Sequence, residues 1–159
     1  MNVAICELAV ELLRKWGLVR LPAFGTSMVP VIHPGDELGV QRADLEKICP
    51  GDIVVYARRG RLIVHRVVAV GADCTRGPYL VTRGDRSPRN DLPVFSSEVL
   101  GVVVTLERDH KPLQVRARPN GAERVIRRIL RSSDRATYLY LRLSTLWRGL
   151  RFKGVSCQP

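Results

Sequence analysis

The sequence predicts a mainly β domain with helices at both ends. Between residues 21 and 106, short runs rich in β-branched residues alternate with turns built from Gly, Pro and Asp, which is typical of strands. Apolar residues recur at helical spacing near both ends of the chain. With 159 residues, of which 45% are hydrophobic and 26% charged, the chain is long enough for one ordinary globular domain.

The first element is an amphipathic helix over residues 3–16. Its apolar side chains recur three or four positions apart, with charged residues on the opposite face. The apolar set is Ile5, Leu8, Ala9, Leu12, Leu13 and Trp16. Gly17 follows at a position where glycine commonly ends a helix. We therefore expect residues 1–19 to form a helical segment in front of a β-domain.

The β-domain is expected over residues 20–107, with strands at residues 37–41, 52–57, 62–70, 79–83 and 99–106. The motif Pro-Gly-Asp precedes two of these strands, and proline and glycine suit the central positions of a turn. We interpret its aspartates, Asp36 and Asp52, as turn residues rather than catalytic groups. A long polar loop spans residues 84–93.

Residues 108–159 form a basic extension, with a short strand expected at 113–117 and helices at 122–131 and 137–151. The whole chain carries a net charge of +11. The extension holds 13 Lys and Arg against 3 Asp and Glu, whereas residues 1–107 hold 13 against 12. A basic surface of this kind attracts anionic lipid, nucleic acid or acidic proteins.

Two interpretations of the basic helices stay open. Either they lie on an anionic membrane surface, or they pack on the β-domain with a solvated basic face. Nucleic acid is the less favoured partner because the extension lacks a recognisable nucleic-acid-binding motif and has few aromatic residues.

Neither a transmembrane nor a secreted protein is expected. The longest nearly uncharged apolar runs, near residues 62–70 and 99–106, are shorter than the about 20 residues that cross a bilayer. No secretory signal pattern is visible, which favours a protein in the cytoplasm or at the inner membrane face. The four cysteines are scattered without a Cys-x-x-Cys pair, so we expect free thiols, no metal site and no cofactor.

Side chains with chemical potential occur in three separate segments. Ser27 stands in the turn sequence Gly-Thr-Ser-Met-Val-Pro, which can expose a hydroxyl beside free backbone N–H groups. His65 interrupts an apolar strand, where a buried imidazole needs a hydrogen-bond partner. Asp85 and Asp91 lie six residues apart in the polar loop, where three arginines of the same segment offer them surface ion pairs. Each feature alone is more typical of structure than of catalysis.

The order of these features resembles the signal peptidase I superfamily, which also contains the self-cleaving SOS repressors. Gly-Thr-Ser-Met-Val-Pro followed by Gly-Asp is similar to its nucleophile box. Gly-Asp-Ile-Val-Val-Tyr and then Ile-Val-His-Arg-Val resemble the base box of the endoplasmic-reticulum and archaeal branch, in which histidine replaces lysine. Thr-Arg-Gly-Asp with a later Asp, and the strand Glu-Val-Leu-Gly-Val-Val, resemble the remaining boxes. The resemblance covers about residues 20–107 and implies a coiled or barrel-like β-fold.

The resemblance implies a serine endopeptidase that cleaves a precursor protein or peptide. Ser27 matches the nucleophile that becomes acylated, and His65 matches the general base. Asp91 matches the carboxylate that orients the histidine, and Asp85 matches a second acid nearby. Which of the two aspartates orients His65 stays open. Activity should fall at acidic pH, because a protonated imidazole cannot accept the serine proton.

The substrate cleft is expected around the serine turn. The Ser27 backbone N–H is the natural oxyanion donor, Thr26 is a candidate second donor, and Met28 would line the cleft. Anchored members of the family usually carry serine where this chain has Gly25, and they have an N-terminal transmembrane segment that is not expected here. The resemblance implies small residues flanking the scissile bond. No lysine falls in the base box, so a Ser-Lys dyad is not expected.

Two other functions compete with a peptidase that acts in trans. Self-cleaving relatives use lysine and cut an Ala-Gly or Cys-Gly bond, and this sequence contains neither dipeptide. The other alternative is a non-enzymatic basic module that binds anionic lipid or nucleic acid through residues 108–159.

Overall fold

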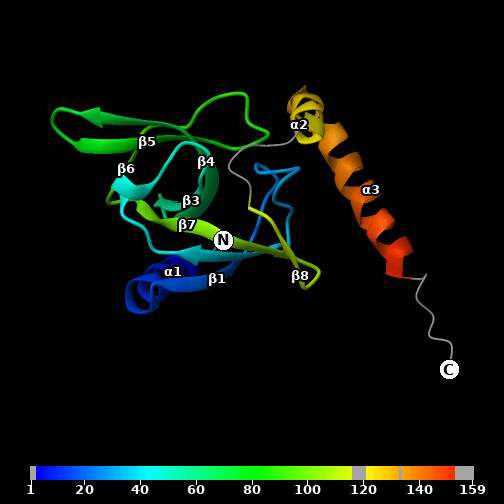
Figure 1. Cartoon of the computed structure of the whole chain (residues 1–159), viewed down its shortest axis with the longest axis horizontal. Coiled ribbons are helices and arrows are strands. Elements are labelled where there is room, and N and C mark those ends of the chain that lie inside the picture. Colours follow the sequence, from blue (N-terminus) through cyan, green and yellow to red (C-terminus); the bar gives the residue numbers. More distant parts are fainter. Residues whose placement is uncertain (1–2, 116–120, 133, 153–159) are drawn as a thin grey trace.

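The protein is mainly β, as predicted, with one sheet and helices outside it (Figure 1). The structure, a computed structural model, describes residues 3–115, 121–132 and 134–152. The sheet has eight strands: β1 (Leu18–Pro22), β2 (Glu37–Gln41), β3 (Ile53–Arg58), β4 (Arg61–Asp73), β5 (Gly77–Arg83), β6 (Val94–Phe95), β7 (Val99–Arg108) and β8 (Lys111–Leu113). A single 3-10 turn, η1 (Leu45–Lys47), lies between β2 and β3.

The N-terminal helix α1 (Val3–Trp16) has the bounds that the sequence predicts. It buries Cys6, Ala9 and Leu13, which lie three or four positions apart on one face. Gly17 ends the helix with a φ of 71°, and its N–H donates to the Leu13 carbonyl at 3.0 Å. A side chain would be strained at this φ, so glycine fits the position. The apolar stripe therefore places α1 beside β1 and ties it to the core.

All described strand pairs are antiparallel, in the order β1-β2-β7-β3-β4-β5-β6, with β8 added beside β7. Because β1 and β6 end this path, the described sheet is open rather than a closed barrel. The five strands expected between residues 37 and 106 all form. The largest extension is in β4, which continues to Asp73 because it pairs with β3 along its first half and with β5 along its second.

Three strands differ from the sequence-based prediction. β1 and β6 were not predicted, and the strand expected at 113–117 is misplaced, since β8 covers Lys111–Leu113. Residues 116 and 117 of that expected strand lie outside the described residues. β8 starts earlier because Asp109 and His110, with φ values of 51° and 60°, turn the chain straight back onto β7. Two successive residues with positive φ are typical of a tight hairpin turn.

β3 is the central strand and is buried on both faces. Ile53 and Val55 belong to one core cluster, with Met28, Ile32 and Leu38 among its members. Alternate residues of β3, including Tyr56, belong to a second cluster on the opposite face of the sheet. The first cluster anchors the turn that carries Ser27, as described below.

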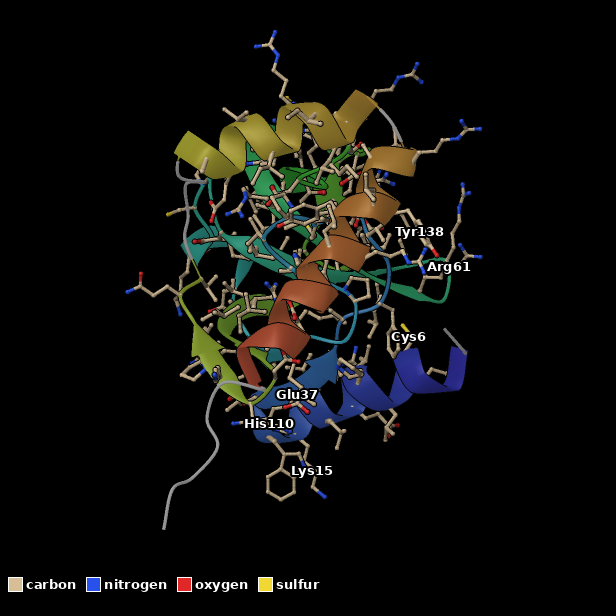
Figure 2. The ribbon with its side chains drawn as sticks, turned by 90° about the vertical axis from the view of Figure 1, so that its right-hand side faces the viewer. Cys6, Lys15, Glu37, Arg61, His110 and Tyr138 are labelled. Carbon is tan, nitrogen blue, oxygen red and sulfur yellow. The ribbon has the colours of Figure 1, made fainter. Side chains whose placement is uncertain are left out.

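The C-terminal extension forms α2 (Gly121–Ser132) and α3 (Asp134–Phe152), close to the predicted helices. Figures 1 and 2 place α2 on the opposite side of the sheet from α1, and Figure 2 shows α3 crossing in front of the β-domain. Leu130 and Thr137 are buried where the two helices meet. In the described part of the chain, no helix combines the length and the apolar content needed to cross a bilayer.

Candidate active site

Ser27 lies on an exposed turn whose following residues are buried. The side chains of Met28 and Val29 are 4% and 0% exposed, so they anchor the turn in the core, whereas Ser27 is exposed. The backbone N–H groups of Val31 and Ile32 both donate to the Met28 carbonyl at 3.0 Å. The turn therefore holds the Ser27 hydroxyl at the surface of a well-anchored loop.

His65 joins Ser27 to Asp91. It lies on β4, in register with Val54 of β3. Its Nε2 is 3.1 Å from Ser27 Oγ, and its Nδ1 is 2.6 Å from Asp91 Oδ2. The His65 and Asp91 side chains are only 13% and 22% exposed, so the pair is partly shielded from water. The structure thus brings a turn, a strand and a loop residue into one hydrogen-bonded line.

The ionisation state of the Asp91 carboxyl group determines which ring nitrogen of His65 carries the hydrogen. Burial opposes ionisation of this carboxyl, but hydrogen bonds from His65 and Thr82 outweigh it and hold the pKa of Asp91 below its ordinary value. An ionised carboxylate can only accept hydrogen bonds, so the shared hydrogen belongs to His65 Nδ1. In the neutral imidazole, Nε2 is then an acceptor facing the Ser27 hydroxyl.

Two further residues, neither of them predicted from the sequence, support the Asp91 carboxylate. Thr82 Oγ1 donates to Asp91 Oδ2 at 2.7 Å, and the Asp91 N–H donates to the Thr82 carbonyl at 2.8 Å. Tyr56 is buried, and this burial raises the pKa of its phenol to about 12, so the hydroxyl beside Asp91 keeps its proton. One sequence feature could have indicated these two residues: each carries a hydroxyl group within a predicted strand, Tyr56 in 52–57 and Thr82 in 79–83.

Asp85 occupies a different environment from Asp91. It is fully buried, and its carboxylate accepts from Arg66 of β4 at 3.0 and 3.1 Å and from Arg127 of α2 at 2.6 Å. Among the described residues, no hydrogen bond joins its side chain to Ser27 or His65. Asp91, rather than Asp85, is therefore the acid that contacts the imidazole.

The surface ion pairs expected for Asp85 were wrong. Arginines of the same loop were the partners that the sequence offered, but the observed partners of Asp85 come from β4 and α2. The reason is burial: the loop turns Asp85 inward beneath α2, where arginines that are distant in the sequence reach it.

The expected oxyanion donors lie at the serine turn. In the described residues the Ser27 N–H has no intramolecular acceptor, so it is free to bind a developing oxyanion. The Thr26 carbonyl accepts from the Val29 N–H at 3.3 Å, and Thr26 is absent from the lining of the adjacent cleft. A second donor role for Thr26 stays a prediction. Met28 does line the cleft.

An apolar cleft of about 380 Å³ opens beside Ser27 and His65. Leu21 and Pro22 of β1 border it, as do Leu62 and Val64 of β4. In the described sheet, β1 pairs only with β2, and the first half of β4 pairs only with β3. Two strand edges that lack a second partner therefore border the cleft.

The two Pro-Gly-Asp aspartates are turn residues, as predicted. Asp36 Oδ2 accepts from the His33 N–H at 2.7 Å, and Asp52 Oδ2 accepts from the Cys49 N–H at 2.9 Å. Asp36 has an additional role, since both its carboxylate oxygens accept from Arg108 of β7 at 2.7 Å.

The described cysteines are free thiols, as expected. Cys6 is buried and Cys49 and Cys74 are exposed, while Cys157 lies outside the described residues. Across residues 3–115, 121–132 and 134–152, no three His, Cys, Asp or Glu side chains come together as a possible metal site.

Neither a protein-family model nor a curated protein sequence matches this chain. The chemical interpretation of the site therefore depends on its geometry, together with the resemblance of the sequence motifs. Ser27, His65 and Asp91 belong to the sequence motifs, and in the structure their side chains contact one another.

Proposed function

We propose that this protein is a serine endopeptidase similar to the Ser-His branch of the signal peptidase I superfamily, with the β-fold of that superfamily. The observation that carries the proposal is the line of contacts from Ser27 Oγ to His65 Nε2 at 3.1 Å and from His65 Nδ1 to Asp91 at 2.6 Å. A hydroxyl, an imidazole and a carboxylate in this order are the usual arrangement for activating a serine.

Acylation begins when Ser27 Oγ attacks the carbonyl carbon of the scissile peptide bond. His65 Nε2 takes the hydroxyl proton, and Asp91 stabilises the imidazolium that results. The Ser27 backbone N–H donates to the oxyanion of the tetrahedral intermediate. Collapse of this intermediate breaks the C–N bond, and His65 returns the proton to the leaving amine. The product is an ester on Ser27.

Deacylation repeats the same steps with water as the nucleophile. His65 takes a proton from the water, the hydroxide attacks the ester carbonyl, and the proton returns to Ser27 Oγ as the acid product leaves. Both half-reactions need the neutral imidazole of His65, because a protonated ring cannot accept a proton from Ser27 or from water.

The substrate is a peptide that binds in an extended conformation. The cleft lies between edges of β1 and β4 that lack a second strand partner, and such edges bind extended chains through backbone hydrogen bonds. Its apolar lining favours apolar side chains next to the scissile bond. The family resemblance implies that these side chains are small. We place cleavage in trans, on a precursor protein or peptide.

Replacement of the nucleophile tests the proposal. Purified protein should react with a fluorophosphonate probe at Ser27, located by mass spectrometry, and should hydrolyse members of an extended-peptide library. Ser27→Ala should abolish both reactions and keep the circular dichroism spectrum, because it removes only an exposed hydroxyl. Ser97→Ala, at another exposed serine, is the matched control and should react like the unaltered protein. Turnover retained by Ser27→Ala would disprove the proposal.

We also propose peripheral contact with an anionic membrane, through an exposed stripe on α3. Arg135 and Arg142 alternate there with Tyr138, Leu139 and Leu143, and all five are exposed (Tyr138 is labelled in Figure 2). These five described residues combine arginine with apolar side chains and include no acidic residue, a composition that suits an anionic interface.

Vesicle flotation tests the membrane proposal. Vesicles that contain phosphatidylglycerol should carry the protein upward at low salt, whereas pure phosphatidylcholine vesicles should not. A protein with both Arg135→Gln and Arg142→Gln should bind more weakly to the anionic vesicles. Binding to duplex DNA without binding to vesicles would overturn this proposal in favour of the nucleic-acid alternative.

A further inference from the structure

The C-terminal helices hold the loop between β5 and β6 from outside the sheet. Arg127 of α2 donates through Nη2 to Asp85 Oδ1 at 2.6 Å and through Nε to the Asp85 carbonyl at 3.2 Å. Arg131, one turn further along, reaches the same carbonyl at 3.5 Å. The Arg127 side chain is only 11% exposed, so this contact is a shielded one. One guanidinium thus binds both the side chain and the backbone of Asp85.

The next helix makes two further contacts with the loops of the candidate site. Thr137 of α3 is 3% exposed, and its hydroxyl accepts from Arg86 Nη1 at 3.0 Å. The Tyr140 ring meets the His33 ring edge-on, with 5.7 Å between the ring centres. His33 belongs to the loop that follows Ser27, where its Nε2 lies 3.1 Å from the Pro30 carbonyl. The two helices therefore contact both the loop that carries the nucleophile and the loop that carries the acid.

Residues 84–86, the segment that contains Asp85, also lie against Ser27 and His65. The Arg86 N–H donates to the Ser27 carbonyl at 2.8 Å. Gly84 packs so closely that a Cβ added there would lie 3.0 Å from His65 Nε2 and 3.1 Å from Ser27 Cβ. A small shift of residues 84–86 would therefore change the spacing between the hydroxyl and the imidazole. Misplacement of reacting groups by about 1 Å costs up to about a hundredfold in rate.

We infer that Arg127 is a positioning residue, through which the C-terminal helices set the alignment of Ser27 with His65. It acts on Asp85, and Asp85 fixes the 84–86 segment against both groups. The inference rests on the proposed peptidase function for its catalytic consequence, but the structural coupling can be measured separately. The C-terminal extension is accordingly part of the catalytic unit rather than an appended tail.

Arg127→Ala is the decisive variant, and Arg128→Ala is its matched control. Both remove one arginine from α2, but Arg128 is exposed on the outer surface of the helix. In Arg127→Ala, kcat and the rate of Ser27 labelling by a fluorophosphonate should fall about tenfold. KM should stay within about twofold, because the cleft is lined by β1, β4 and the serine turn. Arg128→Ala should keep all three values.

A conservative replacement separates positioning from folding. Arg127→Lys keeps a cation for the Asp85 carboxylate but cannot also reach its carbonyl, so kcat should recover part of the loss. Thr137→Val, which removes the acceptor for Arg86 and keeps the shape, should lower kcat by about twofold without changing KM. Rates are referred to the amount of folded protein, measured by thermal melting of each variant.

Hydrogen exchange followed by mass spectrometry tests the coupling without any reaction. Peptides that contain residues 84–91 and 25–31 should exchange about tenfold faster in Arg127→Ala than in Arg128→Ala. Equal exchange and equal labelling rates in the two variants would overturn the inference. Failure of the unaltered protein to react with probe or peptide would instead refute the peptidase proposal, and the exchange result would still decide the coupling.

Discussion

Two aspartates of one loop, six residues apart, occupy opposite environments. Asp91 is partly exposed and contacts a histidine and a threonine hydroxyl, whereas Asp85 is fully buried between two arginines. Imidazole exchanges a proton near neutral pH, but a guanidinium keeps its proton throughout the accessible range. In the proposed mechanism Asp91 therefore supports proton transfer by orienting and stabilising the imidazole, whereas Asp85 holds β4, α2 and its own loop together. The partner, rather than the residue type, assigns each role.

The largest expected effect distinguishes Asp91 from Asp85 by peptidase activity. Asp91→Asn should lower kcat by about 10³–10⁴-fold, because an amide can donate to His65 Nδ1 and so place the ring hydrogen on Nε2. Peptide hydrolysis measures the loss, and circular dichroism checks the fold. Asp44→Asn is the control, since that side chain is 69% exposed and its ion pair is with Lys47 rather than with a group of the candidate site. Full activity in Asp91→Asn would show that Asp91 has no role in the mechanism.

The second-largest expected effect distinguishes Asp85 from Asp91 by the stability of the folded protein. Asp85→Asn leaves the guanidiniums of Arg66 and Arg127 buried without their counter-charge, so the free energy of unfolding should fall by about 3–5 kcal/mol. Urea denaturation measures this change, with Asp91→Asn as the internal comparison. The contrast between the two aspartates fails if Asp85→Asn unfolds at the same urea concentration as the unaltered protein.

The smallest effect is a pH dependence of melting. Folding lowers the pKa of Asp91, so its stabilising contribution is present above the ordinary carboxyl pKa and is lost as pH falls through the lowered value. The melting temperatures of the unaltered protein and Asp91→Asn should differ by a few degrees near neutral pH. This difference should shrink as the pH falls below about 4, the ordinary pKa of the carboxyl group. Asp73, with a pKa of about 2, titrates in both proteins and cancels. A difference that grows on acidification contradicts the assignment.

Local sequence patterns predicted the elements that depend on local rules. The helical spacing of apolar residues located α1, and strand-forming residues between turns located β2 within its observed bounds. β1 is as long as β2 but was missed because it ends in Pro22 and no Pro-Gly-Asp turn precedes it, and β6 has only two residues. Both become strands by pairing, β1 with β2 and β6 with β5. β8 was misplaced because the Asp109–His110 turn, rather than strand propensity, decides where it starts.

The same division applies to the candidate site. Ser27, His65 and Asp91 could be singled out because each stands in a recognisable local motif, and the motifs occur in a familiar order. Thr82 and Tyr56 could not, since their hydroxyls gain importance only from the carboxylate that the fold brings beside them. Arg127 belongs to a basic helix that offered many equivalent arginines, and only its packing against Asp85 distinguishes it.

By itself the sequence determined the helices at both ends, the five strands expected between residues 37 and 106, the basic charge of the last third and the three segments that carry side chains with chemical potential. These properties follow from short-range periodicity, turn preferences and composition, all of which depend only on residues that are near one another in the sequence or on their total numbers. The tertiary structure decided which aspartate faces the imidazole, where the other is buried and which arginine of α2 joins it. Those outcomes depend on contacts between segments far apart in the chain, and the free energy of such contacts depends on burial and distance in space rather than on sequence spacing.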